Sequence, residues 1–428
     1  MRKRTWFTFA ALILAAAALG ATAHASGNRY TEKDLVSMRN SLLGKAPLTE
    51  GQDVNGDGHV DVFDMIRMRR GLILTGDFSV KSCPVTEDHV KYTGRNYYNN
   101  GTVWLVQSGS AIEFSVEARS AEITLRGEMG MSGSKDMRPR YAVVVDGEIV
   151  RDDVLNSTEE TVELFSGEEV RCASVKVIHL SEAADGAVGV SAVTADCCTD
   201  EPVTPAEEKK LRIEFIGDSI TCGYGVDAPS QYESFRTTTE NFMKSYAYLA
   251  AEMLGADYSA VCYSGYGIIS GYTPDGTKNA ANLVPAYYEC YGRDYPAKWD
   301  FSAKPNDVVI INLGTNDSTY IDRDPDSRGA EFIKAYSEFL TTVRKNNPDA
   351  HIICTLGIMG ASSEYKMIEQ AIAEYRQASG DSRIYCYQAP VQVSADGYGA
   401  DWHPSAATQE KNAGILAEKI RQVLGSDN

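Results

Sequence analysis

The chain has 428 residues, of which 43% are hydrophobic and 23% are charged, so it is long enough for two or three globular domains that bury sizeable cores. Its 59 acidic and 41 basic residues give a formal net charge of −18. This charge argues against nucleic acids and anionic membranes as partners, and it suits a neutral substrate.

The first 25 residues have the pattern of a secretory signal peptide. A basic stretch, Arg2–Arg4, precedes the apolar run Trp6–Gly20, and an Ala-x-Ala cleavage site follows at Ala23–Ala25. An uncleaved membrane anchor is the alternative, but a membrane span needs about 20 apolar residues, more than this run offers. No later segment is apolar enough to cross a bilayer. We therefore expect a secreted, extracellular protein with no membrane partner.

A twelve-residue acidic segment, DVNGDGHVDVFD, fits the pattern of a calcium-binding loop. Such a loop gathers several oxygen atoms around a hard cation, and a glycine at its sixth position lets the chain reverse. Gly58 occupies that position here. A solvated acidic turn is the alternative, but four spaced oxygen-bearing side chains rarely coincide with such a glycine. The predicted ligands of a structural Ca²⁺ are Asp53, Asn55, Asp57, the carbonyl of His59, Asp61 and Asp64.

Residues 28–76 contain a faint internal repeat around this loop. TEKDLVSMRNSLLG aligns with DVFDMIRMRRGLIL at an offset of 30 residues, and each half predicts an amphipathic helix, but the first half has Ala23, Ala25 and Gly27 at its ligand positions. The segment resembles a type I dockerin, a small all-α calcium module that binds the cohesin domains of a scaffoldin. A calcium-stabilised hairpin without a partner is the alternative. The residues that the resemblance places against the cohesin are Val62, Phe63, Arg69 and Arg70.

Residues 80–198 are predicted to form a β-sandwich. Their short segments alternate apolar and polar residues with a period of two, and turn residues separate them. Examples are AIEFSVEA, EITLRGE, YAVVVDGEIV, ETVELF and ASVKVIHL. His89 and His179 are isolated in this region, so both are expected to be structural. Residues 199–210, TDEPVTPAEEKK, combine prolines with charge clusters and are predicted to be a linker.

From residue 211 to residue 428, apolar strands alternate with amphipathic helices. This order predicts an α/β domain whose parallel sheet is covered on both faces. Strands are expected at LRIEFIG, YSAVCYSG, DVVIINLG, HIICTLG and RIYCYQA, and helices at residues 245–254, 330–346, 363–378 and 407–424. Ligands of such sheets bind beyond the carboxyl ends of the strands, and the chemically interesting residues lie there.

Four of these strand ends carry residues suited to acyl transfer. Ser219 follows the first strand, where a nucleophile faces the crevice, but a serine hydroxyl needs a base to activate it. His403, in the loop after the fifth strand, is the candidate base. Gly265 and Asn316 follow the second and third strands. With the N–H of Ser219, they would offer three hydrogen-bond donors to an oxyanion.

The motifs GDSIT, SGYG, GTND and DWHP resemble, in that order, the four sequence blocks of the SGNH (GDSL) hydrolase superfamily. With the preceding sandwich and its segment GRNYYNNGTVWLVQSGSAIEFSVEA, the domain resembles carbohydrate esterase family 2, whose two-domain enzymes remove acetyl groups from plant polysaccharides. The resemblance implies a three-layer, flavodoxin-like catalytic domain, a jelly-roll sandwich and catalysis without a cofactor. It assigns Ser219 as nucleophile, His403 as base, and Gly265 and Asn316 as oxyanion donors.

This sequence departs from the superfamily pattern at the residue that is expected to orient His403. Most SGNH enzymes have an aspartate three residues before the histidine, and here that position is Ala400. Asp401 lies two residues before it and is the predicted third catalytic residue, because a carboxylate on Nδ1 would fix the tautomer and stabilise the imidazolium. The alternative is a backbone carbonyl in that role, with Asp401 capping the loop or contacting sugar.

The expected function is that of a secreted, cellulosome-associated O-acetyl esterase acting on hemicellulose such as xylan, mannan or glucomannan. Its expected partners are acetylated plant polysaccharide and a cohesin, with Ca²⁺ as a structural ion only. The alternatives are an SGNH lipase or thioesterase acting on small acyl substrates, and a noncatalytic carbohydrate-binding protein. The nine cysteines lack the spacing of a zinc site, and export leaves room for one or two disulfides.

Overall fold

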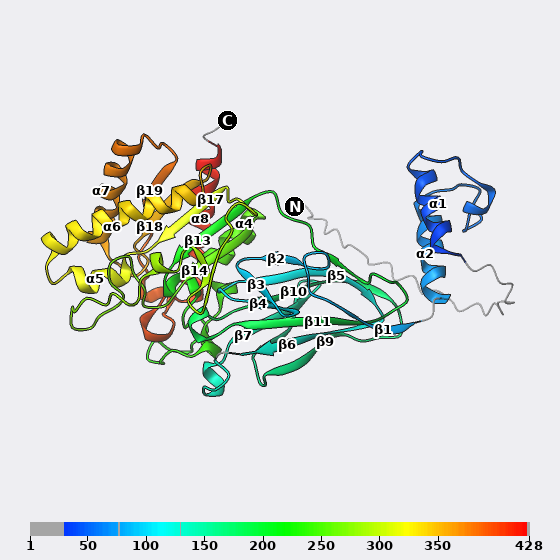
Figure 1. Cartoon of the computed structure of the whole chain (residues 1–428), viewed down its shortest axis with the longest axis horizontal. Coiled ribbons are helices and arrows are strands. Elements are labelled where there is room, and N and C mark those ends of the chain that lie inside the picture. Colours follow the sequence, from blue (N-terminus) through cyan, green and yellow to red (C-terminus); the bar gives the residue numbers. More distant parts are fainter. Residues whose placement is uncertain (1–29, 76–77, 129, 426–428) are drawn as a thin grey trace, which may run out of the picture. The chain divides into compact units, whose positions relative to one another are not determined.

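The computed structural model describes residues 30–75, 78–128 and 130–425 and divides the chain into two compact units, residues 1–77 and 78–428 (Figure 1). The predicted signal peptide, residues 1–25, lies outside the described residues. Among the helices that are described, none combines the length and the apolar character that a membrane span requires.

The N-terminal unit contains a pair of helices, α1 (Glu32–Leu42) and α2 (Val62–Thr75), with the short 3-10 helix η1 (Glu50–Gln52) between them. A capping box made by Thr31 and Asp34 starts α1. Met38 and Met68, which occupy equivalent positions in the sequence repeat, are both buried. The two predicted helices are therefore present, and the repeat supplies matching residues to their shared core.

The second unit begins with a β-sandwich of two antiparallel six-stranded sheets. In strands β5 and β6, buried side chains alternate with more exposed ones along the chain, as the period-two pattern predicted. The first sheet has the order β3 (Asn96–Asn99), β4 (Thr102–Leu105), β11 (Val188–Cys197), β6 (Ser120–Gly127) and β9 (Glu159–Phe165), with β1 (Ser79–Cys83) also paired with β11. The second has the order β12 (Val203–Pro205), β5 (Ala111–Ala118), β10 (Arg171–His179), β7 (Arg140–Val145) and β8 (Glu148–Val154), with β2 (Lys91–Thr93) also paired with β5.

The prediction that residues 199–210 form only a linker is wrong. Residues 203–205 form strand β12, in which Val203 pairs with Val116 of β5 and is 2% exposed. Burial of the apolar Val203 side chain in the sandwich core holds this segment in place. Pro205 is tolerated because β12 is an edge strand, where a missing N–H leaves no ladder bond unmade.

The C-terminal part of the unit, residues 211–425, contains a parallel five-stranded sheet, and all five predicted strands are confirmed. The strands are fully buried in the centre of the sheet, as the continuous apolar runs indicated. Their order is β14 (Asp257–Cys262), β13 (Arg212–Gly217), β17 (Val308–Asn312), β18 (His351–Leu356) and β19 (Ile384–Gln388).

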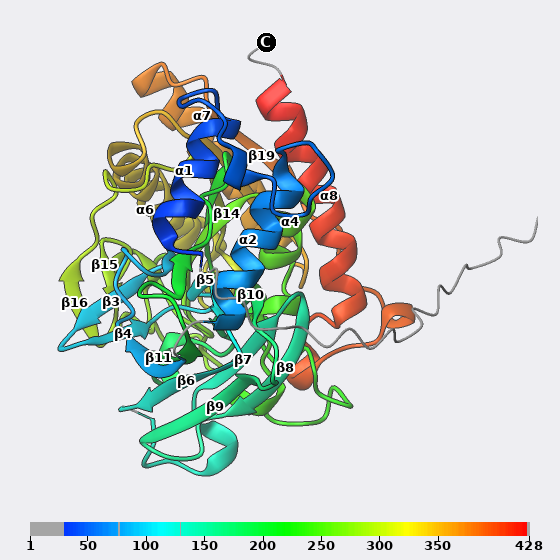
Figure 2. The same ribbon diagram turned by 90° about the vertical axis from the view of Figure 1, so that its right-hand side faces the viewer.

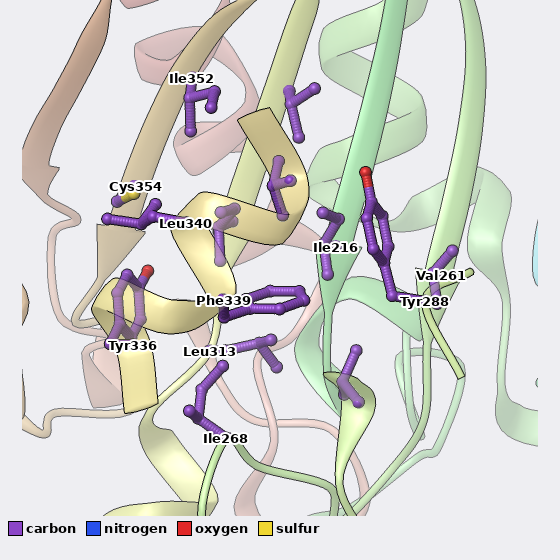
Figure 3. Close-up of a cluster of buried hydrophobic side chains, with 14 of the residues drawn as sticks. Ile216, Val261, Ile268, Tyr288, Leu313, Tyr336, Phe339, Leu340, Ile352 and Cys354 are labelled. Atoms are coloured by element: carbon purple, nitrogen blue, oxygen red, sulfur yellow. The ribbon is translucent and has the colours of Figure 1, made fainter. Parts of the chain in front are cut away.

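Helices cover both faces of this sheet, which gives the predicted three layers (Figures 1 and 2). Helices α6 (Pro325–Asn346) and α7 (Ser362–Ser379) pack on the face that carries Ile216 and Ile311. Helices α4 (Tyr246–Leu254) and α8 (Ala406–Gly425) pack on the opposite face. Figure 3 shows Phe339 and Leu340 of α6 against the strands. Two short helices at the strand ends, α3 (Ser219–Cys222) and α5 (Thr315–Ile321), were not predicted.

The sandwich and the C-terminal part share a core. Trp104 and Val106, at the end of β4, belong to the same buried cluster as Tyr263, which follows β14. A salt bridge of 2.8 Å joins Arg95 of the sandwich to Glu214 of β13, and both side chains are fully buried. The two regions that the sequence predicted as separate domains therefore fold as one unit.

Candidate active site

A tight turn presents Ser219 at the carboxyl end of β13. Ser219 is the first residue of α3, and the Asp218 carboxylate caps this helix by accepting the Ile220 N–H at 3.0 Å. A Cβ atom added to Gly217 would lie 2.0 Å from Thr221 Oγ1, so only glycine fits at the start of the turn. The serine is 5% exposed and is held on a rigid element at the edge of the sheet.

His403 reaches this serine from the loop before α8. Its Nε2 atom lies 2.9 Å from Ser219 Oγ, and its Nδ1 atom lies 3.2 Å from the carbonyl oxygen of Ala400. Because a carbonyl oxygen can only accept a hydrogen bond, the ring proton is on Nδ1 and Nε2 is free to accept the serine proton. The two predicted residues therefore have the geometry of a nucleophile and its general base.

The electrostatic environment keeps His403 neutral. Burial lowers the pKa of its imidazole from 6.5 to about 4, and the bond to Ala400 and the charge of Asp401 oppose this shift. At neutral pH the ring is therefore unprotonated, which is the form that a general base requires.

Asp401 does not hold the position predicted for it. Its Oδ2 atom accepts a hydrogen bond of 2.7 Å from the Tyr224 hydroxyl, whereas the Ala400 carbonyl occupies Nδ1 of His403. The Tyr224 ring is stacked on the imidazole, with centroids 4.0 Å apart. The backbone explains the difference, because a left-handed φ of 48° at Asp401 reverses the chain and brings the preceding carbonyl to the ring. The third-residue prediction is thus wrong, and Asp401 acts on His403 through Tyr224.

The three residues predicted to supply oxyanion donors, Ser219, Gly265 and Asn316, line the same pocket. The amide Nδ2 of Asn316, in α5, donates to the Tyr266 carbonyl at 2.8 Å, which leaves its second hydrogen only a long contact of 3.4 Å to Asp218. Gly265 has a φ of 76°, a conformation that favours glycine. In the described part of the chain, neither the Gly265 N–H nor the Ser219 N–H has a hydrogen-bond acceptor. The arrangement leaves donors for an oxyanion.

A pocket of about 640 Å³ surrounds these groups, within the range of small-molecule sites. Two aromatic side chains lie at or beside it with much of their surface exposed, Tyr272 at 55% and Trp402 at 48%. The Trp402 ring packs against the rings of Tyr232 and Tyr398. The residues that line the pocket are Ser219, Tyr224, Ser264, Gly265, Tyr272, Thr315, Asn316, Ser318, Thr319, Met359, Asp401 and His403.

Two buried carboxyl groups that the sequence analysis did not single out hold the loop that carries Gly265. Asp317 accepts the N–H groups of three successive residues, 268–270, at distances between 2.7 and 3.1 Å. Glu182, from the sandwich, accepts the Ser264 N–H at 2.6 Å. Burial raises the pKa of Asp317 to about 6 and that of Glu182 to about 7. The GTND motif contains a signal for Asp317, but nothing near Glu182 in the sequence marks it.

Glu182 belongs to a buried cluster with Cys222 and Glu240, and their possible ligand atoms all lie within 4.8 Å of one another. Burial raises the pKa values of all three groups. Neutral, protonated side chains therefore account for this cluster. Among the described residues, the predicted calcium loop contains no comparable group of three possible ligand atoms from His, Cys, Asp or Glu side chains.

The side chains of the calcium loop instead bond to the loop's own backbone. The two carboxylate oxygens of Asp53 accept the N–H groups of Gly56 and Gly58 at 2.7 and 2.9 Å. Asp64 is fully buried and accepts three backbone N–H groups. The predicted ligands therefore line one compact loop, while their carboxylates stay further apart than in a closed coordination shell.

Comparisons with known proteins bear on the second unit. Residues 215–411 match the GDSL-like Lipase/Acylhydrolase family, and residues 92–199 match the Carbohydrate esterase 2 N-terminal family. The structure of a family two carbohydrate esterase from Clostridium thermocellum in complex with cellohexaose is 30% identical, with a TM-score of 0.68, over 78% of this chain and 99% of that chain. The chain belongs to carbohydrate esterase family 2. This family assignment confirms the predicted SGNH catalytic domain with a β-rich domain before it.

Two curated relatives extend the family comparison. The cellulase/esterase CelE of Acetivibrio thermocellus is 32% identical over 324 residues, which cover 74% of this chain and 37% of that protein. An acetylxylan esterase / glucomannan deacetylase of Cellvibrio japonicus is 27% identical over 371 residues, which cover 82% of this chain and 98% of that protein. The chain thus spans little more than a third of the first relative and nearly all of the second.

Proposed function

We propose that this family 2 esterase removes O-acetyl groups from hemicellulose such as xylan, mannan or glucomannan. The observation that carries the proposal is the 2.9 Å contact between Ser219 Oγ and a neutral His403, beside three oxyanion donors. The relative named acetylxylan esterase / glucomannan deacetylase supports the substrate class. The net charge of −18 is compatible with a neutral polysaccharide.

The reaction follows from these positions in two steps. Ser219 Oγ attacks the acetyl carbonyl while His403 Nε2 takes its proton, and the oxyanion is held by the N–H groups of Ser219 and Gly265 and by Asn316. His403 then returns the proton to the departing sugar hydroxyl, which leaves an acetyl-serine. In the second step the neutral imidazole accepts a proton from water as the water attacks the acetyl carbonyl, and it then returns that proton to the departing Ser219 Oγ, so that acetate leaves and both the serine hydroxyl and the neutral imidazole are restored.

Acetate release measures the proposal directly. Acetylated xylan, glucomannan and 4-nitrophenyl acetate are supplied to the wild type and to Ser219→Ala, with Ser157→Ala, an exposed serine on the sandwich, as the matched control. We expect Ser219→Ala to lose activity and Ser157→Ala to keep it, with circular dichroism showing both folded. Activity in Ser219→Ala would refute the assignment, and a preference for long-chain 4-nitrophenyl esters would favour a lipase.

We also propose that residues 28–76 form a dockerin-like module that binds Ca²⁺ and a cohesin domain. The donor set fits a hard cation, because Asp53, Asn55, Asp57, Asp61 and Asp64 all offer oxygen. When bound, the ion would draw these oxygens together and fix the start of α2. Val62 and Phe63 on that helix are 48% and 65% exposed, which supports a docking surface there. Arg69 belongs to the same proposal, whereas the side chain of Arg70 lies outside the described residues.

Calorimetry and cohesin binding test this module. Asp53→Ala should abolish Ca²⁺ binding in the full chain, whereas Asp349→Ala, whose side chain is 95% exposed in the other unit, should leave it intact. Binding to a panel of purified type I cohesins should be lost with Asp53→Ala and with chelator. Cohesin binding that survives chelation, or no Ca²⁺ binding at all, would contradict the proposal.

Export and association with a cellulosome complete the proposal. The signal-peptide pattern of residues 1–25 supports export, and the dockerin-like module supports the association. Mass spectrometry of the protein in the culture medium should show an N-terminus near Ser26. A protein retained in the cell with residues 1–25 intact would contradict export.

A further inference from the structure

Two adjoining pockets lie in the second unit away from the residues of the active site. The first, of about 290 Å³, is lined by Tyr97, Tyr98, Tyr291 and Trp299 among others, and the second, of about 550 Å³, lies between the 299–306 segment and residues 345–349. Trp299 and Asp300 line both pockets. Neither pocket shares a lining residue with the active-site pocket, so a ligand in them would leave Ser219 accessible.

The first pocket has aromatic walls set at steep angles to one another. The rings of Tyr97 and Tyr291 are 5.3 Å apart at 67°, and those of Tyr291 and Trp299 are 5.2 Å apart at 88°. Tyr98 is 46% exposed at the same pocket. The guanidinium of the buried Arg95 lies 5.4 Å from the centroid of the Trp299 ring and supports it. Such walls present rigid apolar faces at low entropic cost.

Each pocket also contains a buried amide oxygen without a hydrogen-bond donor. Asn96, 6% exposed, lines the first pocket, and its Nδ2 is used by the carbonyls of Thr93 and Ala111 while its Oδ1 has no partner in the described residues. Asn306, 8% exposed, lines the second pocket, and its Oδ1 is likewise unpartnered there. Both oxygens have almost no exposed surface, so they lie within the pocket walls, and the groups that a ligand would meet are the exposed ring faces and carboxylates.

The charges restrict the class of ligand. Glu87 and Asp300 contribute exposed carboxylates to the first pocket, and its cation, Lys304, is already bonded to Glu208 and to the carbonyl of Tyr92. An anionic ligand would therefore meet repulsion. Aromatic faces combined with exposed carboxylate acceptors suit a neutral molecule with apolar C–H faces and many hydroxyl donors, which describes a carbohydrate.

We propose that these two pockets form a second carbohydrate-binding groove, which holds an unacetylated stretch of a neutral polysaccharide on either side of Trp299. The groove would keep the enzyme on the polymer while the active site acts elsewhere on it. This role rests on the proposed esterase function, but sugar binding in the groove does not require any catalysis.

Binding measurements in the Ser219→Ala background test the groove. Cellohexaose and xylohexaose are titrated calorimetrically into the full chain and into versions that also carry Tyr98→Ala or Trp299→Ala, with Ile149→Ala, an exposed sandwich residue, as the control. We expect at least one of the two sugars to bind, and Tyr98→Ala and Trp299→Ala to weaken that binding by roughly tenfold, a free-energy change of about 1.4 kcal/mol. Because Tyr98 is largely exposed, its variant remains informative if Trp299→Ala misfolds. Absence of binding, or affinities unchanged in Tyr98→Ala, would overturn the proposal.

Kinetics separate this proposal from the proposed function. In the Ser219-containing enzyme, Tyr98→Ala should raise KM for polymeric acetylated xylan and leave kcat/KM for 4-nitrophenyl acetate unchanged. Loss of activity on both substrates would place Tyr98 in the catalytic machinery and contradict a separate groove. A wild type without esterase activity that still binds the hexasaccharide through Tyr98 would refute the proposed function alone.

Discussion

At the scale of single residues, the neutral state of His403 sets the pH range of activity. Burial lowers its pKa from 6.5 to about 4, and only the unprotonated ring can accept the serine proton. We expect kcat/KM for acetate release to be flat through pH 6.5 and to fall as the pH drops through about 4. Circular dichroism at each pH shows whether the fold persists. A half-maximal value near pH 6.5 in folded protein would contradict the burial argument.

A second prediction at this scale tests whether Asp401 acts as a third catalytic residue. The Asp401 carboxylate accepts a hydrogen bond from the Tyr224 hydroxyl, and the Ala400 carbonyl orients His403. Asp401→Asn can still accept the tyrosine hydrogen, so we expect a loss of less than about tenfold in kcat, against about 10⁴-fold for an aspartate bonded to the catalytic imidazole. Tyr224→Phe, which keeps the stacked ring, should behave similarly, whereas Tyr224→Ala should lose more. A collapse of kcat in Asp401→Asn alone would restore the triad.

At the scale of secondary-structure elements, the sandwich supports the loop that carries the oxyanion donor. Glu182 follows β10 and accepts the Ser264 N–H at 2.6 Å, one residue before Gly265. Through this bond, a segment of the sandwich helps to position the Gly265 N–H, which is a candidate oxyanion donor. Helix α3, which carries the nucleophile, also contacts the Glu182 carboxyl group: Cys222 Sγ lies 3.9 Å from Glu182 Oε2.

Replacement of Glu182 measures the value of this support. Glu182→Ala removes the acceptor for the Ser264 N–H, and we expect kcat to fall by roughly 10²-fold, the lower end of the loss of one oxyanion donor, with KM little changed. Glu182→Gln keeps an acceptor oxygen, and its amide can donate to the unpartnered Oε1 of Glu240, so it should recover most of the activity. Equal kcat values for Glu182→Ala and the wild type would show that the loop carrying Gly265 keeps its position without the bond from Ser264 to Glu182.

At the scale of the whole molecule, residues 78–428 are joined across their two predicted domains by buried charge. Arg95 donates to Glu214 at 2.8 Å and to the carbonyls of Tyr288 and Cys290 at 2.5 Å. Arg95→Met leaves Glu214 buried without its cationic partner, and we expect a loss of about 3–5 kcal/mol in the free energy of unfolding. Denaturant unfolding of this unit measures it. Two separate transitions in the wild type, one for each predicted domain, would contradict the shared core.

Much of the architecture follows from local sequence patterns. All five parallel strands and the four long helices of residues 211–428 were predicted, because a continuous apolar run and a 3.6-residue periodicity each report burial directly. The linker prediction failed at Val203, since prolines and charges around a single apolar residue hide a short edge strand. The core shared by the two predicted domains was not predicted either, because Trp104 and Tyr263 are far apart in the chain and no local pattern shows that they pack together.

Local sequence patterns were enough to place Ser219, Gly265 and Asn316 at strand ends, and His403 in the loop after the last strand, of one parallel sheet, because the carboxyl ends of parallel strands share a common edge. The atom that orients His403 could not be identified from these patterns and depends on how the loop folds. Ala400 and Asp401 are neighbours, and the choice between a carbonyl and a carboxylate depends on the backbone angle at Asp401, which the packing of the loop against Tyr224 sets. Likewise, contacts that join Glu182 to Ser264 arise only when distant segments are packed together, and no local pattern encodes them.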